Sequence, residues 1–120
     1  MLYAWGMEEL HREKPRYEVS IRLSLAGKDQ GLLRVLDISE GGFQGRGPVR
    51  TGKGQALEGV IHVAPLAGER DVRLRCTVMS VQGEGEKAVI GARIDSFGSP
   101  GEKAAYLAFL GELAEDFGTL

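Results

Sequence analysis

The strongest constraint on the fold of this chain is a strict alternation of apolar and polar residues in YEVSIRLSL, residues 17–25. The apolar positions of this stretch are Tyr17, Val19, Ile21, Leu23 and Leu25. Successive side chains of a β-strand point to opposite faces of the sheet, so a period of two indicates a strand that buries one face. The pattern therefore predicts a half-buried β-strand over these residues.

Other stretches share this strand character: LLRVLDI (32–38), QALEGVIHV (55–63), DVRLRCTVMSV (71–81) and AVIGARI (88–94). The chain contains 18 glycines among 120 residues, and they are concentrated between these stretches, as in GKDQG and GEGEK. Short strands joined by glycine-rich turns favour a sandwich or a small barrel. The length suits one domain.

The stretch SPGEKAAYLAFLGELAEDFG predicts one helix over residues 100–117. Ser99 and Glu102 have the spacing of a capping box, and Pro100 stands at the first helical position, where its missing N–H costs nothing. Apolar side chains recur at helical spacing at Tyr106, Phe109, Leu110, Leu113 and Phe117. We expect this amphipathic helix to pack on the β-structure rather than on a partner.

The charge and cysteine content exclude several classes of protein. The formal net charge is -2, so no global basic field attracts nucleic acid or an anionic membrane, and any anion site must be local. The single Cys76 excludes an internal disulfide framework and a cysteine-rich zinc site. No apolar run is long enough for a membrane span, and no signal peptide is evident. We expect a cytoplasmic protein that neither binds a nucleic-acid polymer nor inserts into a membrane.

Polar residues interrupt the end of the second predicted strand, in VLDISEGGF. Asp37 and Ser39 occupy alternate positions, so we expect both side chains to point outward onto one rim. Gly41 and Gly42 follow; glycine permits a positive φ and lets the backbone approach a flat ring that a Cβ would exclude. A carboxylate, a hydroxyl and two glycines in this order predict a small polar binding rim.

Two arginines lie upstream, in HREKPRY. Arg12 and Arg16 are four residues apart, and Pro15 disfavours a helical conformation at Lys14, so we expect an extended or turning loop that leads into the first strand. Two guanidinium groups on a short loop suit a phosphate group or the O6/N7 edge of guanine.

Together, these two elements resemble the signature of the PilZ family, the bacterial receptor domains for cyclic di-GMP. The pattern is R-x-x-x-R, then 20 residues, then D-x-S-x-x-G, at Arg12, Arg16, Asp37, Ser39 and Gly42. The resemblance implies a six-stranded antiparallel β-barrel over residues 12–120, with the helix at 100–117 at its end and residues 1–11 as a separate amino-terminal segment. It also implies that the two arginines grip the phosphates and guanine edges, while the other three residues wrap a guanine.

The chemistry of guanine agrees with these roles. Asp37 is suited to accept hydrogen bonds from the N1–H and N2–H₂ groups of guanine, and arginine reads O6 and N7 in bidentate fashion. Ser39 offers a hydroxyl that bonds to a base or a phosphate, or orients Asp37. Gly41 and His11 are supporting candidates, since His11 precedes Arg12 at a position that influences whether this family holds one ligand or a stacked pair.

We therefore expect a cyclic di-GMP receptor that uses no cofactor and no metal, and that relays binding to an unidentified protein effector. The expected mechanism is ordering of the loop that carries Arg12 and Arg16, which relocates residues 1–11. The alternative is a ligand-independent adaptor of the same fold that acts through protein–protein contacts of the helix at 100–117. An enzyme is the least expected class, because the chain shows no acid–base pair, nucleophile constellation or metal cluster.

The remaining polar residues and the cysteine have simpler interpretations. His62 falls on the polar face of its strand and is expected to be exposed. Arg73 and Arg75 fall on the outer face of theirs and are expected to be solvated. Cys76 alternates with core residues, which predicts a buried thiol rather than a nucleophile.

Overall fold

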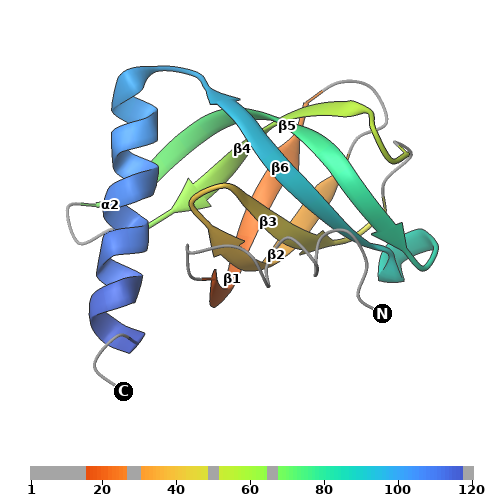
Figure 1. The fold of residues 1–120 in the computed structure, drawn as a ribbon, viewed down its shortest axis with the longest axis horizontal. Helices are drawn as coiled ribbons and strands as arrows, with labels where there is room; N and C mark the ends of the chain where they lie inside the picture. Colours follow the sequence, from red (N-terminus) through yellow and green to blue (C-terminus); the bar gives the residue numbers. More distant parts are fainter. Residues whose placement is uncertain (1–15, 27–30, 49–51, 65–67, 118–120) are drawn as a thin grey trace.

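Six antiparallel strands close into a barrel in the order β1-β2-β3-β6-β5-β4 (Figure 1). The computed structural model describes residues 16–26, 31–48, 52–64 and 68–117. Its elements are β1 (Arg16–Leu25), β2 (Leu32–Ser39), β3 (Gly42–Arg46), β4 (Ala56–Val63), β5 (Arg70–Gln82), η1 (Gly85–Lys87), β6 (Val89–Phe97) and α2 (Pro100–Phe117). The expected six-stranded barrel with a carboxyl-terminal helix is confirmed. His11, Arg12 and the amino-terminal segment 1–11 lie outside the described residues.

The core lies inside the barrel and follows the predicted alternation in β1, β4 and β5. The fully buried apolar side chains include Leu23, Leu33, Val35, Ile38, Phe43, Ile61, Val72, Val78, Ile90 and Ala92. Cys76 is 1% exposed and belongs to the same cluster, so the prediction of a buried thiol is confirmed. Burial raises the pKa of this thiol to about 12, which keeps it protonated and unreactive at neutral pH.

The strand β3 is the element that periodicity did not predict. Its sequence GFQGR carries two glycines in five residues, and glycine is depleted in strands. The strand nevertheless pairs with β2 on one side and β6 on the other, and its Phe43 is fully buried. Gly45 is buried as well and lies against Leu33 in the core. Without β3, β2 and β6 would each expose an unpaired edge.

The helix α2 stands alongside the barrel and contacts β5, β1, β4 and β6 (Figure 1). Tyr106, Phe109 and Leu110 are buried in the same cluster as the barrel interior, which confirms that the helix packs on the β-structure. No helix in the described part of the chain combines the length and the apolar character needed to cross a membrane.

The amino-terminal cap of α2 is formed differently from the predicted capping box. The Glu102 backbone N–H donates to Ser99 Oγ at 3.2 Å, as expected. The Glu102 carboxylate, however, accepts from the Arg73 backbone N–H at 2.7 Å and from Arg73 Nη2 at 2.8 Å. Arg73 is exposed on the outer face, as predicted, and its contact with Glu102 was not predicted. Because the carboxylate reaches across to β5, this contact joins the start of α2 to the barrel.

Candidate functional site

The register of β1 and β2 brings together two residues of the predicted motif. Arg16 is opposite Ser39, and Glu18 is opposite Asp37, so the Arg16 and Asp37 side chains lie diagonally across the two strands. Arg16 Nη2 donates a hydrogen bond to Asp37 Oδ1 and forms an ion pair with it. The Arg16 side chain is 9% exposed and that of Asp37 is 23% exposed, so both charges are sheltered from water.

Arg16 differs in one respect from the prediction. It is the first residue of β1 and its side chain is largely buried, whereas the sequence predicted that it lies on a loop before the first strand. The pairing of β1 with β2 extends to this residue, which explains its burial. Removing the Arg16 side chain should therefore affect the stability of the fold.

Irregularities in both strands aim Asp37 outward. The register of β2 on β3 shifts between Val35 and Asp37, and that of β1 on β2 shifts between Glu18 and Ile21. A bulge adds a residue to one strand and re-aims the side chains that follow it. Val35 and Ile38 both remain in the core as a result, while Asp37 is partly exposed on the outer face opposite Gln44.

A hollow of about 280 Å³ lies over this part of the barrel and is lined by Arg16, Tyr17, Glu18, Asp37 and Gln44. A guanidinium, two carboxylates, an amide and a phenol supply both donors and acceptors for a heterocyclic base. Sequence reasoning missed Glu18 and Gln44, because only the strand register makes them neighbours of Asp37.

Ser39 does not point outward as predicted. Its residue is fully buried, and its Oγ donates to the Gly42 carbonyl oxygen at 3.3 Å. The hydroxyl therefore bridges the turn between β2 and β3. A contribution of Ser39 to ligand binding through the shape of this turn remains a prediction.

The two glycines of the turn also have separate surroundings. Gly42 is buried and pairs with Arg93 of β6, while the Gly41 carbonyl accepts from the Ile94 N–H at 2.8 Å. The expectation that these glycines supply a positive φ is wrong, since the described glycines with positive φ lie elsewhere, at residues 47, 54, 68, 83 and 85. A Cβ built at Gly41 would meet no atom within 4 Å, so open space adjoins this residue.

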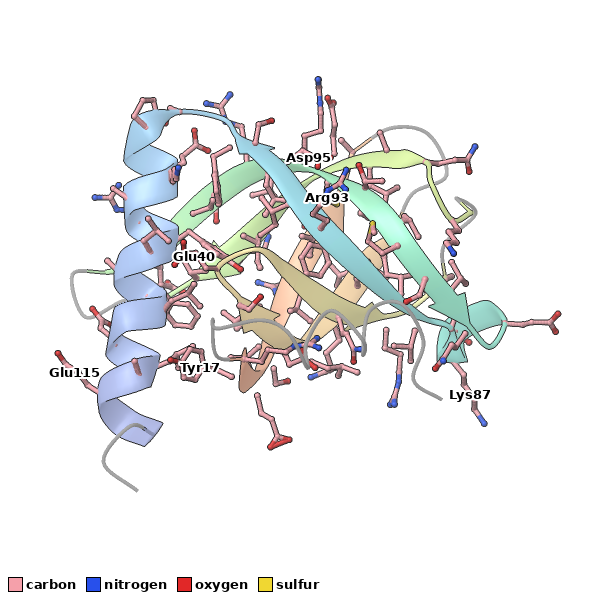
Figure 2. The ribbon with its side chains drawn as sticks, in the orientation of Figure 1. Tyr17, Glu40, Lys87, Arg93, Asp95 and Glu115 are labelled. Atoms are coloured by element: carbon pink, nitrogen blue, oxygen red, sulfur yellow. The ribbon has the colours of Figure 1, made fainter. Side chains whose placement is uncertain are left out.

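Tyr106 links the helix α2 to the same turn. Its hydroxyl donates to the Ser39 carbonyl oxygen at 2.8 Å, and its ring lies against Phe97 with centroids 5.3 Å apart. Burial raises the pKa of Tyr106, and the negative charge of Asp37 raises it further, so the hydroxyl stays protonated and able to donate. The sequence predicted Tyr106 only as a packing residue. Figure 2 shows Glu40, in the β2–β3 turn, on the side of the barrel that faces α2.

The other outer-face residues form cross-strand contacts. Arg75 is exposed, as predicted, and is also paired with Glu58, with Nε to Oε2 at 3.0 Å. His62 is likewise more than an exposed histidine. Its Nδ1 lies 2.6 Å from Asp71 Oδ1 and its Nε2 lies 3.2 Å from Ser24 Oγ, so it connects three strands.

On β5 and β6, a further outer-face group joins Thr77, Arg93 and Asp95; the last two lie side by side in Figure 2. Hydrogen bonds from Thr77 and then Arg93 lower the pKa of Asp95, so its carboxylate stays charged. Within the described ranges, no three His, Cys, Asp or Glu side chains are grouped so that they could hold a metal ion.

Comparisons with known proteins agree with this architecture. A search of curated proteins found no match. Among solved structures, the Bacillus subtilis inhibitor of motility (MotI/DgrA) is similar, with a TM-score of 0.73 and 15% sequence identity. The match covers 88% of this chain and 50% of that one, so this chain spans half the length of that protein, and the likeness concerns the fold. The family model of the PilZ domain matches residues 10–111. The chain therefore belongs to the PilZ domain family, whose members are binding and adaptor domains.

Proposed function

We propose that this PilZ domain binds cyclic di-GMP and passes the signal to a protein partner in the cytoplasm, without catalysing a reaction. The single observation that carries the proposal is the pairing of Arg16 with Asp37 at the rim of the hollow. Arg12, Arg16, Asp37, Ser39 and Gly42 complete the family's motif, and the described part of it lies on adjacent strands and their turn.

The chemistry of the pair is complementary to guanine. The Asp37 carboxylate accepts the N1–H and N2–H₂ donors, and the Arg16 guanidinium donates to O6, to N7 or to a phosphate. Asp37 stays on the outer face because of the bulge in β2, where a planar base has access to it. Gly41, with open space beside it, leaves room for the face of a ring.

The relay that we propose is ordering of the loop that carries Arg12. Arg16 is the first residue of β1, so a ligand that contacts both arginines bridges the barrel and the residues that precede it. Charge-assisted hydrogen bonds of about 1.5–3 kcal/mol each are large enough to offset the entropy of fixing a few loop residues. Residues 1–11 would then move relative to the barrel rim and change the surface that a partner meets.

Calorimetric titration of the full chain with cyclic di-GMP tests the binding. We expect micromolar affinity or tighter, about 8 kcal/mol or more. Cyclic di-AMP and GTP are the competing ligands, and cyclic di-AMP should bind more weakly because adenine lacks the N1–H that Asp37 reads. Equal heats from the two cyclic dinucleotides would remove Asp37 from base recognition.

Arg16→Ala should abolish this binding, with Arg75→Ala as the matched control. Arg75 also has a carboxylate partner, Glu58, but lies on β5 outside the motif. Because Asp37 is only 23% exposed, loss of its partner should also destabilise the fold by about 1–3 kcal/mol, so binding must be measured below the melting temperature. Full affinity in a folded Arg16→Ala protein would contradict the proposal.

A ligand-independent adaptor is the second candidate. The observation in its favour is that Arg16 and Asp37 already form an ion pair, so the fold has a use for both residues apart from a ligand. The similar solved structure is that of an inhibitor of motility, which suits a domain that acts on another protein. This candidate would be favoured if the native chain captured a partner equally well with and without cyclic di-GMP, and if Asp37→Asn captured the same partner equally well.

A further inference from the structure

Three arginines stand in register on adjacent strands of the barrel, away from the motif. Arg22 on β1 is directly opposite Arg34 on β2, and Arg34 is directly opposite Arg46 on β3. All three are exposed on the outer face. We call them the arginine row.

Such a row is unfavourable for the fold itself, because like charges directly opposite each other destabilise a sheet. Three exposed arginines further along β5 and β6 are arranged differently, and each of these three has a carboxylate partner: Arg73 has Glu102, Arg75 has Glu58 and Arg93 has Asp95. Among the residues that the structure describes, the arginine row makes no salt bridge, and its only hydrogen bond between side chains runs from Arg34 Nη1 to Ser20 Oγ at 2.7 Å.

The surroundings of the arginine row are suited to contact with another molecule. A hollow of about 300 Å³ runs beside it and is lined by all three arginines together with Leu32, Leu33, Gly47, Pro48 and Glu86. Leu32 is 50% exposed, the highest exposure of the large apolar side chains described. Two carboxylates lie near the row. Glu86 lines the same hollow, and Asp71 lines a neighbouring hollow together with Arg22. Asp71 is paired with His62. Neither carboxylate forms an ion pair with the row.

We propose that the arginine row binds an acidic helix of a partner protein, with Leu32 receiving an apolar side chain of that helix. Neighbouring strands are about 4.8 Å apart, so the three guanidinium stems are spaced at this interval across the sheet. Carboxylates at positions i, i+4 and i+8 of a helix are spaced at about 5–6 Å, which matches a helix laid across the strands. Arginine pairs carboxylates in bidentate fashion, and the net charge of -2 disfavours a nucleic-acid polymer as the occupant.

The arginine row is separate from the proposed cyclic di-GMP site, and the inference does not depend on it. Arg22 and Arg16 lie six residues apart on the same strand, about 20 Å at the rise of a β-strand. A helix on the row and a ligand at Arg16 could therefore be bound together.

The test uses a fluorescent, alanine-based helical peptide with Glu at i, i+4 and i+8 and one Leu beside them, titrated with the full chain at low ionic strength. A peptide with Gln in place of each Glu is the ligand control. The variants are Arg22→Gln with Arg46→Gln, and, as the matched control, Arg75→Gln with Arg93→Gln. Both double variants remove two exposed arginines and two positive charges, but only the first pair lacks carboxylate partners.

We expect saturable, salt-sensitive binding of the Glu peptide that falls at least tenfold in the first double variant and stays unchanged in the control. Arg34→Gln should raise the melting temperature by relieving repulsion, whereas Arg75→Gln should lower it by removing an ion pair.

Absence of binding to the native chain, or an equal loss in both double variants, overturns the proposal. Tighter binding of phosphatidylglycerol vesicles or of a single-stranded oligonucleotide through the same arginines would also overturn the assignment of an acidic helix.

Discussion

The Tyr106 hydroxyl on α2 donates a hydrogen bond of 2.8 Å to the backbone carbonyl of Ser39, which lies 67 positions earlier in the sequence. Ser39 belongs to the D-x-S-x-x-G element, and its own hydroxyl bridges the turn to Gly42. A buried helix residue thus holds the backbone beside the proposed ligand site. If the turn changes when a ligand binds, this hydrogen bond provides a direct route from the turn to α2.

Tyr106→Phe should show this link. The ring and its contact with Phe97 are retained, while the buried Ser39 carbonyl loses its donor, so we expect a destabilisation of about 1–3 kcal/mol, measured by denaturant unfolding. Cyclic di-GMP affinity should fall as well. Tyr106→Leu, which also removes the ring, separates packing from hydrogen bonding. If Tyr106→Phe unfolded at the same denaturant concentration as the native chain, the hydroxyl would contribute nothing to the stability of the fold.

Gly41→Ala should separate ligand binding from folding. A Cβ at Gly41 meets no atom within 4 Å, so the melting temperature should stay unchanged while a ring stacked on the turn is pushed away. Gly59→Ala is the contrasting variant, since its Cβ would lie 2.8 Å from the Ser24 carbonyl oxygen in β1 and should lower the melting temperature. Unchanged cyclic di-GMP affinity in Gly41→Ala would place the ring elsewhere.

The Arg73–Glu102 contact predicts a dependence of stability on acid. Hydrogen bonds from the Arg73 side chain and backbone lower the pKa of Glu102 from 4.5 to about 2. Because the folded pKa is below the unfolded one, the stabilisation is complete above about pH 4.5 and is lost as the pH falls towards 2. Melting temperatures of the native chain and Glu102→Gln should therefore differ near neutral pH and converge near pH 2.

Glu115→Gln is the matched control for that experiment. Glu115 is an exposed glutamate on the same helix, and it points away from the barrel in Figure 2. Its substitution should leave the profile of melting temperature against pH almost unchanged. A gap between native chain and Glu102→Gln that persisted at pH 2 would assign the effect to packing rather than to charge.

The proposed relay predicts a change in the fluorescence of Trp5, the single tryptophan of the chain. Cyclic di-GMP held by Arg12 and Arg16 should move the residues before β1. Trp5 emission should therefore change with added ligand until it saturates, and the midpoint of this change should agree with the dissociation constant from calorimetry. Amide exchange should slow around residues 8–16. Unchanged emission and exchange at saturating ligand would indicate a preformed site, and the Tyr106 link to α2 would then be the route for the signal.

Local patterns in the sequence predicted much of this protein. The period of two identified β1, β4, β5 and β6, because burial of one face dictates every second residue, while β2 was identified as a short apolar run between turns. The cap at Ser99 and the apolar spacing identified α2. The arginine and D-x-S-x-x-G elements indicated the family, which the match over residues 10–111 confirmed.

The tertiary structure decided which residues meet. The glycine-rich β3 is a strand because β2 and β6 supply its partners, not because of its own propensity. Strand register determines three features of the molecule: the burial of Ser39, the pairing of Arg16 with Asp37, and the arginine row. Bulges shift that register by one residue. Register depends on pairing between segments that are distant in the sequence, so a periodic pattern identifies a strand and its buried face but not its opposite neighbour.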